Sequence, residues 1–282
     1  MVAVAEEDAR HLTVKSGADG VAEVIFHHAP INLVDRELFR AMRHVVRDLE
    51  ADDDVRVIVF SSAVTGFFLA HFDVAMIRDF PQRIPRPTTL NTWHVLCEAV
   101  RTMPKVTIAM LDGRAGGAGA EFALACDMRF AAAETAVLCQ PETGMGLMAV
   151  GGGTQHLPRV AGRSRALEIL LGADDFDAEL AERYGWVNRA LPQAELGDFV
   201  MRLARRIASF PPEAVAATKR AVLRTAPEVH AGLLQDQIDE AEFRPQPSRL
   251  ERIERFLALG GQTVEAERHL GALFDPDAAP DA

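Results

Sequence analysis

Cysteine is scarce in this sequence, and its few copies form no recognisable framework. Cys97, Cys126 and Cys139 show no CxxC spacing, and such an odd, sparse set argues against disulfides and against a structural zinc site. Hydrophobic residues make up 49% and charged residues 25% of the 282 residues. These ordinary globular proportions exclude disorder, collagen and coiled coil as global descriptions, and the length suffices for one large core.

Long apolar runs and an excess of positive charge are also missing. No apolar run reaches the roughly 18 residues of a membrane span, and the acidic start lacks the order of a signal peptide. The 30 Lys and Arg residues against 41 Asp and Glu residues give a net charge of -11. A diffuse negative field disfavours nucleic acid and anionic membranes. We therefore expect a soluble, cytoplasmic protein with neither of them as its partner.

Strands and helices alternate along most of the chain. Residues 35–50 place apolar side chains at helical spacing, while residues 57–60 and 106–111 are continuous apolar runs typical of strands buried on both faces. This alternation predicts the α/β class with a largely parallel sheet. From about Ala204 onward the pattern is helical, which divides the chain into an α/β core over residues 1–203 and a helical region over residues 204–282.

A proline-rich segment, residues 78–102, separates two of these strands. Pro81, Pro85 and Pro87 predict a loop, with a helix near residues 90–100. A loop of this kind is either a mobile lid or an ordinary surface connection, and the sequence leaves both open.

Residues 104–127 carry the first chemical signal, a strand that runs into a glycine-rich loop and then a helix that starts near residues 118–121. Small residues let the backbone approach a ligand, and a helix start presents free N–H groups. A GxGxxG dinucleotide motif is not satisfied, because Phe122 stands where the third glycine belongs, and no phosphate-binding Lys-Ser/Thr follows. An oxyanion hole, in which an N–H stabilises charge on a carbonyl oxygen, remains.

Two glutamates add an acid/base hypothesis. Glu121 lies in the first turn of the predicted helix, where a carboxylate is either a capping charge or a catalytic group. Glu142 lies in a tight Pro-Glu-Thr-Gly turn between apolar runs. If both share a poorly hydrated cavity, at least one pKa rises, so that one group is a neutral acid and the other a base. The loop over residues 65–74, at the carboxyl end of a strand, offers a second N–H donor.

Six stretches of the chain then match one family in order and spacing: residues 30–33, 68–73, 112–127, 138–142, 152–159 and 185–188. Through them the sequence resembles the enoyl-CoA hydratase/isomerase (crotonase) family. The resemblance implies a crotonase-like ββα spiral with a C-terminal helical oligomerisation region. It also implies a homotrimer or a dimer of trimers, and an acyl-CoA thioester ligand with no metal or redox cofactor, since CoA is part of the substrate.

The family's functional positions carry over residue by residue. The two oxyanion N–H donors fall on Phe72 and Ala118, and the two hydratase glutamates fall on Glu121 and Glu142. The substrate-binding positions are Ala29, Pro30, Ala70, Asp73, Val74, Gly117, Pro141 and Val150. The presence of both glutamates favours reversible hydration of a 2-enoyl-CoA. Isomerisation, dehalogenation, thioester hydrolysis and non-catalytic acyl-CoA binding stay open as alternatives.

The sequence departs from the family pattern around these positions. His71 and Phe72 replace a glycine and an alanine, Ala118 replaces the middle glycine of a run, and Val150 replaces a glycine. The Phe72 ring predicts a reshaped pocket, and Ala118 requires a negative φ. His71 either contacts the ligand or is satisfied by nearby backbone. Lys219, on a predicted C-terminal helix, either faces solvent or reaches CoA phosphates.

Overall fold

The computed structural model describes residues 7–225 and 229–275, and its strands form two sheets. The strands are β1 (Leu12–Ser16), β2 (Val21–Phe26), β3 (Val57–Ser62), β4 (Gly66–Leu69), β5 (Val106–Leu111), β6 (Gly113–Gly116), β7 (Met128–Ala132), β8 (Val137–Cys139), β9 (Phe176–Asp177) and β10 (Arg189–Leu191). The larger sheet has the order β1-β2-β3-β5-β7-β10, and the smaller has the order β4-β6-β8-β9. Among the described strands, only β1 with β2 and β8 with β9 pair antiparallel.

Successive strand pairs divide between the two sheets. In each of the pairs β3 and β4, β5 and β6, and β7 and β8, the first strand joins the larger sheet and the second joins the smaller. A helical segment follows each pair. This repeat is the ββα spiral that the resemblance implies, and it confirms the predicted fold class.

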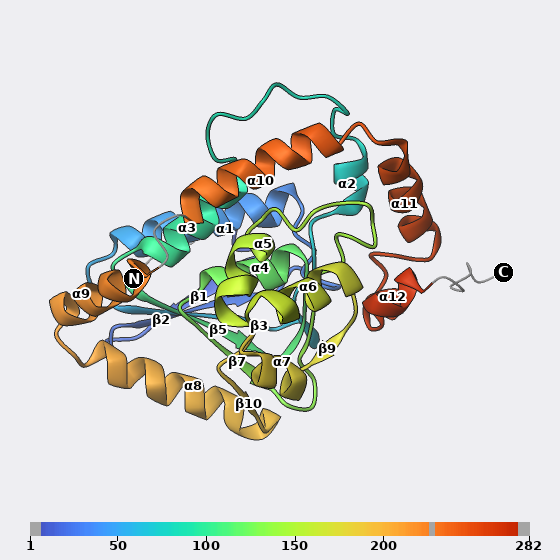
Figure 1. Ribbon diagram of the computed structural model, residues 1–282. Coiled ribbons are helices and arrows are strands. Elements are labelled where there is room, and N and C mark those ends of the chain that lie inside the picture. The colour runs from blue at the N-terminus through green and yellow to red at the C-terminus, as the bar shows by residue number, and fades with distance from the viewer. Residues whose placement is uncertain (1–6, 226–228, 276–282) are drawn as a thin grey trace.

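Twelve α-helices lie between or beyond these strands in the described part of the chain (Figure 1). They are α1 (Arg36–Ala51), α2 (Val74–Arg78), α3 (Thr92–Thr102), α4 (Ala118–Ala125), α5 (Gly153–Val160), α6 (Arg163–Gly172), α7 (Ala178–Tyr184), α8 (Gln193–Ala208), α9 (Pro212–Leu223), α10 (Val229–Phe243), α11 (Pro247–Ala258) and α12 (Val264–Glu267). The observed bounds of α1 and α3 lie within two residues of the predicted ones. Asp35 begins α1 by accepting hydrogen bonds from the backbone N–H groups of Glu37 and Leu38.

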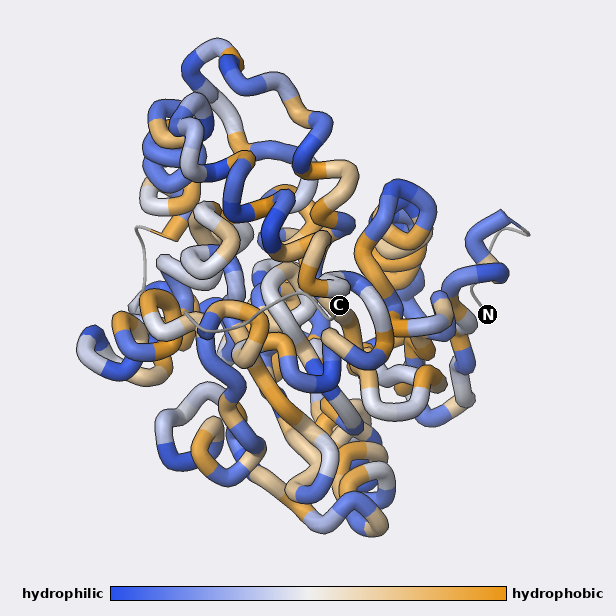
Figure 2. Tube along the Cα trace, turned by 90° about the vertical axis from the view of Figure 1, so that its right-hand side faces the viewer, coloured by the Kyte–Doolittle hydropathy of each residue, from blue (hydrophilic) through white to orange (hydrophobic). Residues whose placement is uncertain are grey.

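The larger sheet is buried on both faces. Val57 and Val59 of β3 pack with α8, while their neighbours Ile58 and Phe60 pack into the main core with α1, α3 and α4. Alternate residues of a strand point to opposite faces, which explains why this run is apolar throughout. Figure 2 shows the same pattern, with apolar segments gathered inside and polar segments along the outer loops.

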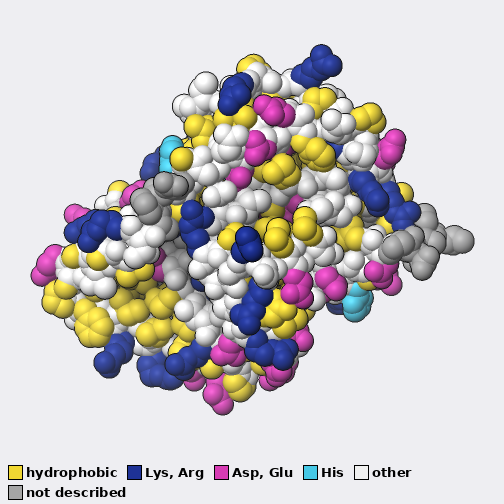
Figure 3. Space-filling view, viewed as in Figure 1, with side chains coloured by type: hydrophobic (Ala, Val, Ile, Leu, Met, Phe, Trp, Pro, Cys, Tyr) yellow, Lys and Arg dark blue, Asp and Glu magenta, His cyan; other side chains and the backbone are white. Residues whose placement is uncertain are grey.

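The C-terminal region is helical, as predicted, and much of it covers the core. The predicted boundary at Ala204 falls inside α8, which belongs with the larger sheet. Helix α10 packs on α5, and α11 packs on α2. Charges of both signs are interspersed over the face shown in Figure 3. Among the described residues, no helix combines the length and the apolar character that crossing a bilayer requires.

Candidate active site

A cavity of about 550 Å³ lies between the start of α4, the loop after β4, and helices α3, α10 and α11. Most of its wall is apolar, but several charged groups reach it. Its lining includes Phe39, His71, Phe72, Val74, Met76, Ile77, Phe80, Ile84, Trp93, Ala118, Glu121, Glu142, Met145, Leu147, Val150, Gly151, Glu240, Arg244 and Arg249. The cavity therefore brings together both predicted glutamates and both predicted N–H donors.

The start of α4 presents a free backbone donor. Gly117 has a positive φ of 43°, which glycine tolerates without a side-chain clash. Ala118 is then the first helical residue, with the negative φ that its Cβ requires. Its N–H has no acceptor within the described chain, because the first N–H groups of a helix have no partner in that helix.

The second predicted donor lies in the segment after β4. Val34 donates to the carbonyl of His71 and accepts from the N–H of Asp73. The N–H of Phe72, between them, has no acceptor among the described residues. A Cβ placed on Gly117 would lie 2.9 Å from the Cβ of His71, so this segment and the start of α4 are in direct contact.

Glu121 is held in place by the glycine run before α5. Its side chain is buried, and Oε1 accepts a hydrogen bond of 3.1 Å from the backbone N–H of Gly153. A Cβ on Gly151 would lie 2.0 Å from Oε2, so only glycine leaves room for the carboxyl group there. Burial raises the pKa of Glu121 well above its ordinary value, and the Glu142 carboxylate raises it further.

Glu142 faces the same cavity from the turn after β8. Its Oε1 lies 2.7 Å from the position of a Cβ on Gly117, and its Oε2 is buried without a hydrogen-bond partner among the described groups. Burial raises the pKa of Glu142 to about 7, although the hydrogen bond from its own backbone N–H and the charge of His71 act in the opposite direction. Neither glutamate is engaged in an ion pair within the described chain.

Aromatic rings shape one wall of the cavity. The Phe72 ring packs edge-on against Trp93 with ring centroids 4.7 Å apart, and Phe39 packs on both of them. The Phe72 ring was predicted to reshape the pocket, and it does so by packing against Trp93 in the cavity wall. The indole N–H of Trp93 is buried without a partner in the described chain. Val150 also lines the cavity, and its carbonyl contacts the Nε2 of His94.

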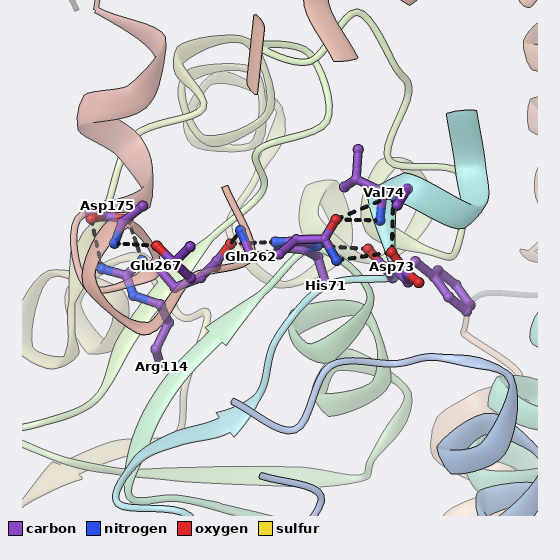
Figure 4. A network of polar contacts seen from close by, with 11 residues as sticks. His71, Asp73, Val74, Arg114, Asp175, Gln262 and Glu267 are labelled. Atoms are coloured by element: carbon purple, nitrogen blue, oxygen red, sulfur yellow. Dashed lines mark hydrogen bonds and ion pairs between the residues drawn. The ribbon is translucent and has the colours of Figure 1, made fainter. Parts of the chain in front are cut away.

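His71 belongs to a buried polar network that reaches the C-terminal region (Figure 4). Its Nδ1 contacts the carbonyl oxygen of Phe72 at 2.7 Å, and its Nε2 contacts Oε1 of Glu267 at 2.8 Å. Gln262 joins Glu267 to the start of α2, because it accepts hydrogen bonds from the N–H groups of Val74 and Ala75. The hydrogen-bonding groups of the His71 ring are thus satisfied by the nearby backbone carbonyl of Phe72 and by the carboxylate of Glu267. The spacing of residues in the sequence gave no means of finding the second partner.

The proline-rich segment forms a wall of the cavity and contacts α10 and the residue that follows it. Phe80 and Ile84 line the cavity. The N–H of Asn91 donates to the side chain of Gln237, and the guanidinium of Arg244 lies over the Phe80 ring. Figure 1 shows this loop arching over α10. Its position next to the site fits a lid, and its motion stays a prediction.

Most of the other predicted binding positions lie off this cavity. Ala29 and Pro30 are exposed after β2, whereas Ala70 is buried with Ile31 and Phe67. The positions that do not line the cavity are Ala29, Pro30, Ala70, Asp73, Gly117 and Pro141, while Val74 and Val150 do line it. The prediction for Lys219 was wrong, because its side chain is buried and pairs with Asp127 at 2.8 Å.

Comparison with known proteins agrees with this architecture. Residues 16–252 match the sequence profile of the family described as enoyl-CoA hydratase/isomerase. A mouse methylglutaconyl-CoA hydratase is 32% identical, over 80% of this chain and 72% of its own length. A short-chain-enoyl-CoA hydratase from Clostridium acetobutylicum is 29% identical, over 73% of this chain and 79% of its own length.

A solved structure is similar over nearly the whole chain. It is a Streptomyces avermitilis protein with the provisional name enoyl-CoA hydratase, 43% identical, with a TM-score of 0.85. The similarity covers 93% of this chain and 96% of that one. The profile match runs from the end of β1 into α11, and the mouse relative also covers most of the sequence. The chain therefore belongs to the enoyl-CoA hydratase/isomerase family.

Proposed function

We propose that the protein reversibly adds water to the double bond of a 2-enoyl-CoA thioester. One observation carries this proposal: two carboxyl groups with raised pKa values, Glu121 and Glu142, line one cavity with the free N–H groups of Phe72 and Ala118. The two relatives reported above carry hydratase names, which supports hydration over the other reactions of the family.

The chemistry needs one base, one acid and a site for negative charge. The ionised carboxylate takes a proton from water while the water oxygen bonds to the β-carbon, and the electron pair of the double bond moves onto the thioester oxygen. The protonated carboxyl group then gives its proton to the α-carbon. The pair of carboxyl groups holds one proton before and after the reaction, so no outside reagent is consumed.

The raised pKa values of Glu121 and Glu142 are consistent with one group acting as the acid and the other as the base. Two carboxylates in one poorly hydrated cavity resist being ionised together, so near neutral pH the pair retains one proton. The two N–H groups would stabilise the enolate oxygen, and removal of one such donor costs about 3–4 kcal/mol in other oxyanion holes. In this assignment Phe72 and Ala118 act through their backbones, which is why their side chains are free to differ from the family pattern.

The test replaces each carboxyl group by its neutral isostere, in Glu121→Gln and Glu142→Gln. Turnover is followed as the loss of absorbance of the conjugated thioester with a panel of 2-enoyl-CoA substrates. We expect each variant to lose at least about 10²-fold in kcat, because each loses one proton-transfer group. Glu195→Gln is the matched control, since Glu195 is exposed on α8, away from the cavity.

Stability separates loss of chemistry from loss of fold. Both glutamates have folded pKa values above the unfolded value, so their ionisation costs stability as the pH rises above about 4.5. The Gln variants should therefore resist urea at neutral pH at least as well as the parent. Turnover that survives one of the two substitutions would indicate a one-base isomerase. Tight binding without turnover in the parent would indicate a binding protein.

Three further expectations remain predictions: a homotrimer or dimer of trimers built through the C-terminal helices, a cytoplasmic location, and a reaction without a metal or redox cofactor. Mass measurement in solution tests the first of these directly.

A further inference from the structure

Arg249 is a buried cation with almost no partner in the described chain. It lies in the first turn of α11, its side chain lines the cavity, and the residue is 1% exposed. Its Nε and Nη1 have no hydrogen-bond acceptor among the described groups, and its Nη2 makes one long contact of 3.4 Å with the carbonyl of Ile77. Arginine is almost never buried in this way without an anion nearby.

The carboxylate whose charge acts on Arg249, that of Glu240, is already neutralised. Glu240 of α10 pairs with Arg244, which lies just past the end of that helix, through contacts of 2.7 Å and 3.1 Å. Arg244, Glu240 and Arg249 all line the cavity, so together they leave one net positive charge at this wall. Burial lowers the pKa of Arg249, an effect that Glu240 opposes and Arg244 reinforces, in agreement with a guanidinium that lacks a counter-ion.

The cavity surface around Arg249 is apolar. Met76 and Ile77 of α2, and Met145 and Leu147 of the turn after Glu142, line the cavity with it. The close packing is specific, because a Cβ on Gly146 would lie 3.1 Å from the Cα of Arg249. A ligand complementary to this wall is an apolar chain that ends in an anion.

We propose that Arg249 binds a carboxylate at the far end of the acyl chain, so that the substrate class is an enoyl-CoA whose acyl group is itself a carboxylic acid. The assignment to the acyl end rests on the proposed function, which puts the thioester at Phe72 and Ala118. The CoA phosphates are the other anions of such a ligand. They are strongly hydrated, whereas Arg249 is buried among apolar side chains, and the positions that the family resemblance assigns to CoA at Ala29, Pro30 and Ala70 lie off the cavity.

Binding is measured by calorimetry with saturated acyl-CoA thioesters of increasing chain length, each as the free ω-carboxylate and as its methyl ester. These ligands cannot be hydrated, so the test does not depend on turnover. We expect the parent to bind one carboxylate ligand about 10- to 100-fold more tightly than its ester, the usual range for a charged hydrogen bond. Arg249→Met should abolish this preference and leave ester binding unchanged.

Two variants complete the design. Arg249→Lys keeps the charge on a different geometry and should retain part of the preference. Arg252→Met is the control, because Arg252 is exposed on the same helix and does not line the cavity. If Arg249→Met weakens carboxylate and ester ligands equally, Arg249 meets the CoA portion, and the proposal is overturned.

Stability gives an independent reading. A cation buried for function costs stability, so Arg249→Met should raise the urea midpoint, whereas removal of a structural cation should lower it. If the carboxylate preference is found but no 2-enoyl-CoA is hydrated, the proposed reaction fails and the binding role of Arg249 stands. If hydration is found without any preference, only the role of Arg249 fails.

Discussion

The ion pair between His71 and Glu267 ties α12 to the segment that carries the proposed Phe72 donor. The two side chains are 3% and 1% exposed, and both ring nitrogens of His71 face acceptor oxygens, so the ring carries two protons. Burial alone lowers the pKa of His71, but the Glu267 carboxylate outweighs it and the pKa is raised. Burial alone raises the pKa of Glu267, but the charge of His71 outweighs it and the pKa is lowered.

Removal of either partner leaves the other buried without its counter-charge. For a pair this buried, such a loss costs about 3–5 kcal/mol. We expect His71→Ala and Glu267→Ala each to lower the free energy of unfolding by about that amount. The double variant should lose less than the sum, with a coupling energy of about 1–3 kcal/mol. Urea unfolding of the four proteins at one fixed protein concentration measures all four free energies.

The pH dependence of the coupling follows from the two shifts. Because the pKa of His71 is raised in the folded protein, its protonation stabilises the fold. This contribution is fully present below the unfolded pKa of 6.5 and is lost as the pH rises through the folded pKa. Because the pKa of Glu267 is lowered in the folded protein, its ionisation also stabilises the fold. This contribution is fully present above the unfolded pKa of 4.5 and is lost as the pH falls through the folded pKa. The coupling should therefore be largest between these two unfolded values and smaller at alkaline pH.

A surface pair provides the control. Arg205 and Asp19 also form an ion pair, at 3.0 Å, but both are exposed, so their double-mutant cycle should give at most about 1 kcal/mol. A coupling energy for His71 and Glu267 no larger than this, or one that is as large at alkaline pH as between the unfolded pKa values of 4.5 and 6.5, would refute the reasoning. If the pair also positions the N–H of Phe72, the single variants should lose kcat by up to about 10²-fold with a smaller change in KM.

Two further predictions concern packing and titration. Gly119→Ala should lower the free energy of unfolding in urea by about 1–3 kcal/mol, because the added Cβ would lie 2.0 Å from the carbonyl oxygen of Leu69. Gly172→Ala is its control, since a Cβ there would have nothing within 4 Å. Equal urea midpoints for the two variants would contradict the prediction. The profile of kcat/KM against pH should fall below about pH 7, where Glu142 takes up a proton and the pair loses its base, and should fall again at higher pH as Glu121 ionises. A flat profile from acidic to alkaline pH would exclude the shared-proton mechanism.

Local patterns made much of the fold predictable from the sequence. The apolar run over residues 57–60 is continuous because Val57 and Val59 face α8 while Ile58 and Phe60 face the main core. The glycine-rich run before Ala118 was informative for a similar reason, since it marks a helix start, where the first N–H groups have no partner within the helix. These features depend on neighbours in the chain, and neighbours are visible in a sequence.

Contacts between distant segments were not predictable in this way. Lys219 was expected at a solvated face or near phosphates, but its side chain is buried and its partner Asp127 lies far away in the sequence, in the turn between α4 and β7. His71 meets Glu267 across an even longer separation. Trp93 reaches the cavity from α3, Gly151 from the loop before α5, and Arg249 from α11, and no local spacing marks any of them.

The unsatisfied polar atoms in the cavity wall indicate which kind of ligand the cavity prefers. Oε2 of Glu142, Nε1 of Trp93, and Nε and Nη1 of Arg249 are buried without partners in the described chain, and all belong to residues that line one cavity. Each such group costs stability in the free protein. Four such atoms on three side chains around an apolar space therefore favour a ligand that is apolar over most of its length and polar at defined points. A water molecule or thioester group near Glu142 and a carboxylate at Arg249 would satisfy two of these three side chains at once. A neutral acyl chain would leave Arg249 as costly in the complex as it is in the free protein, which is why the charge at this wall favours the acidic chain.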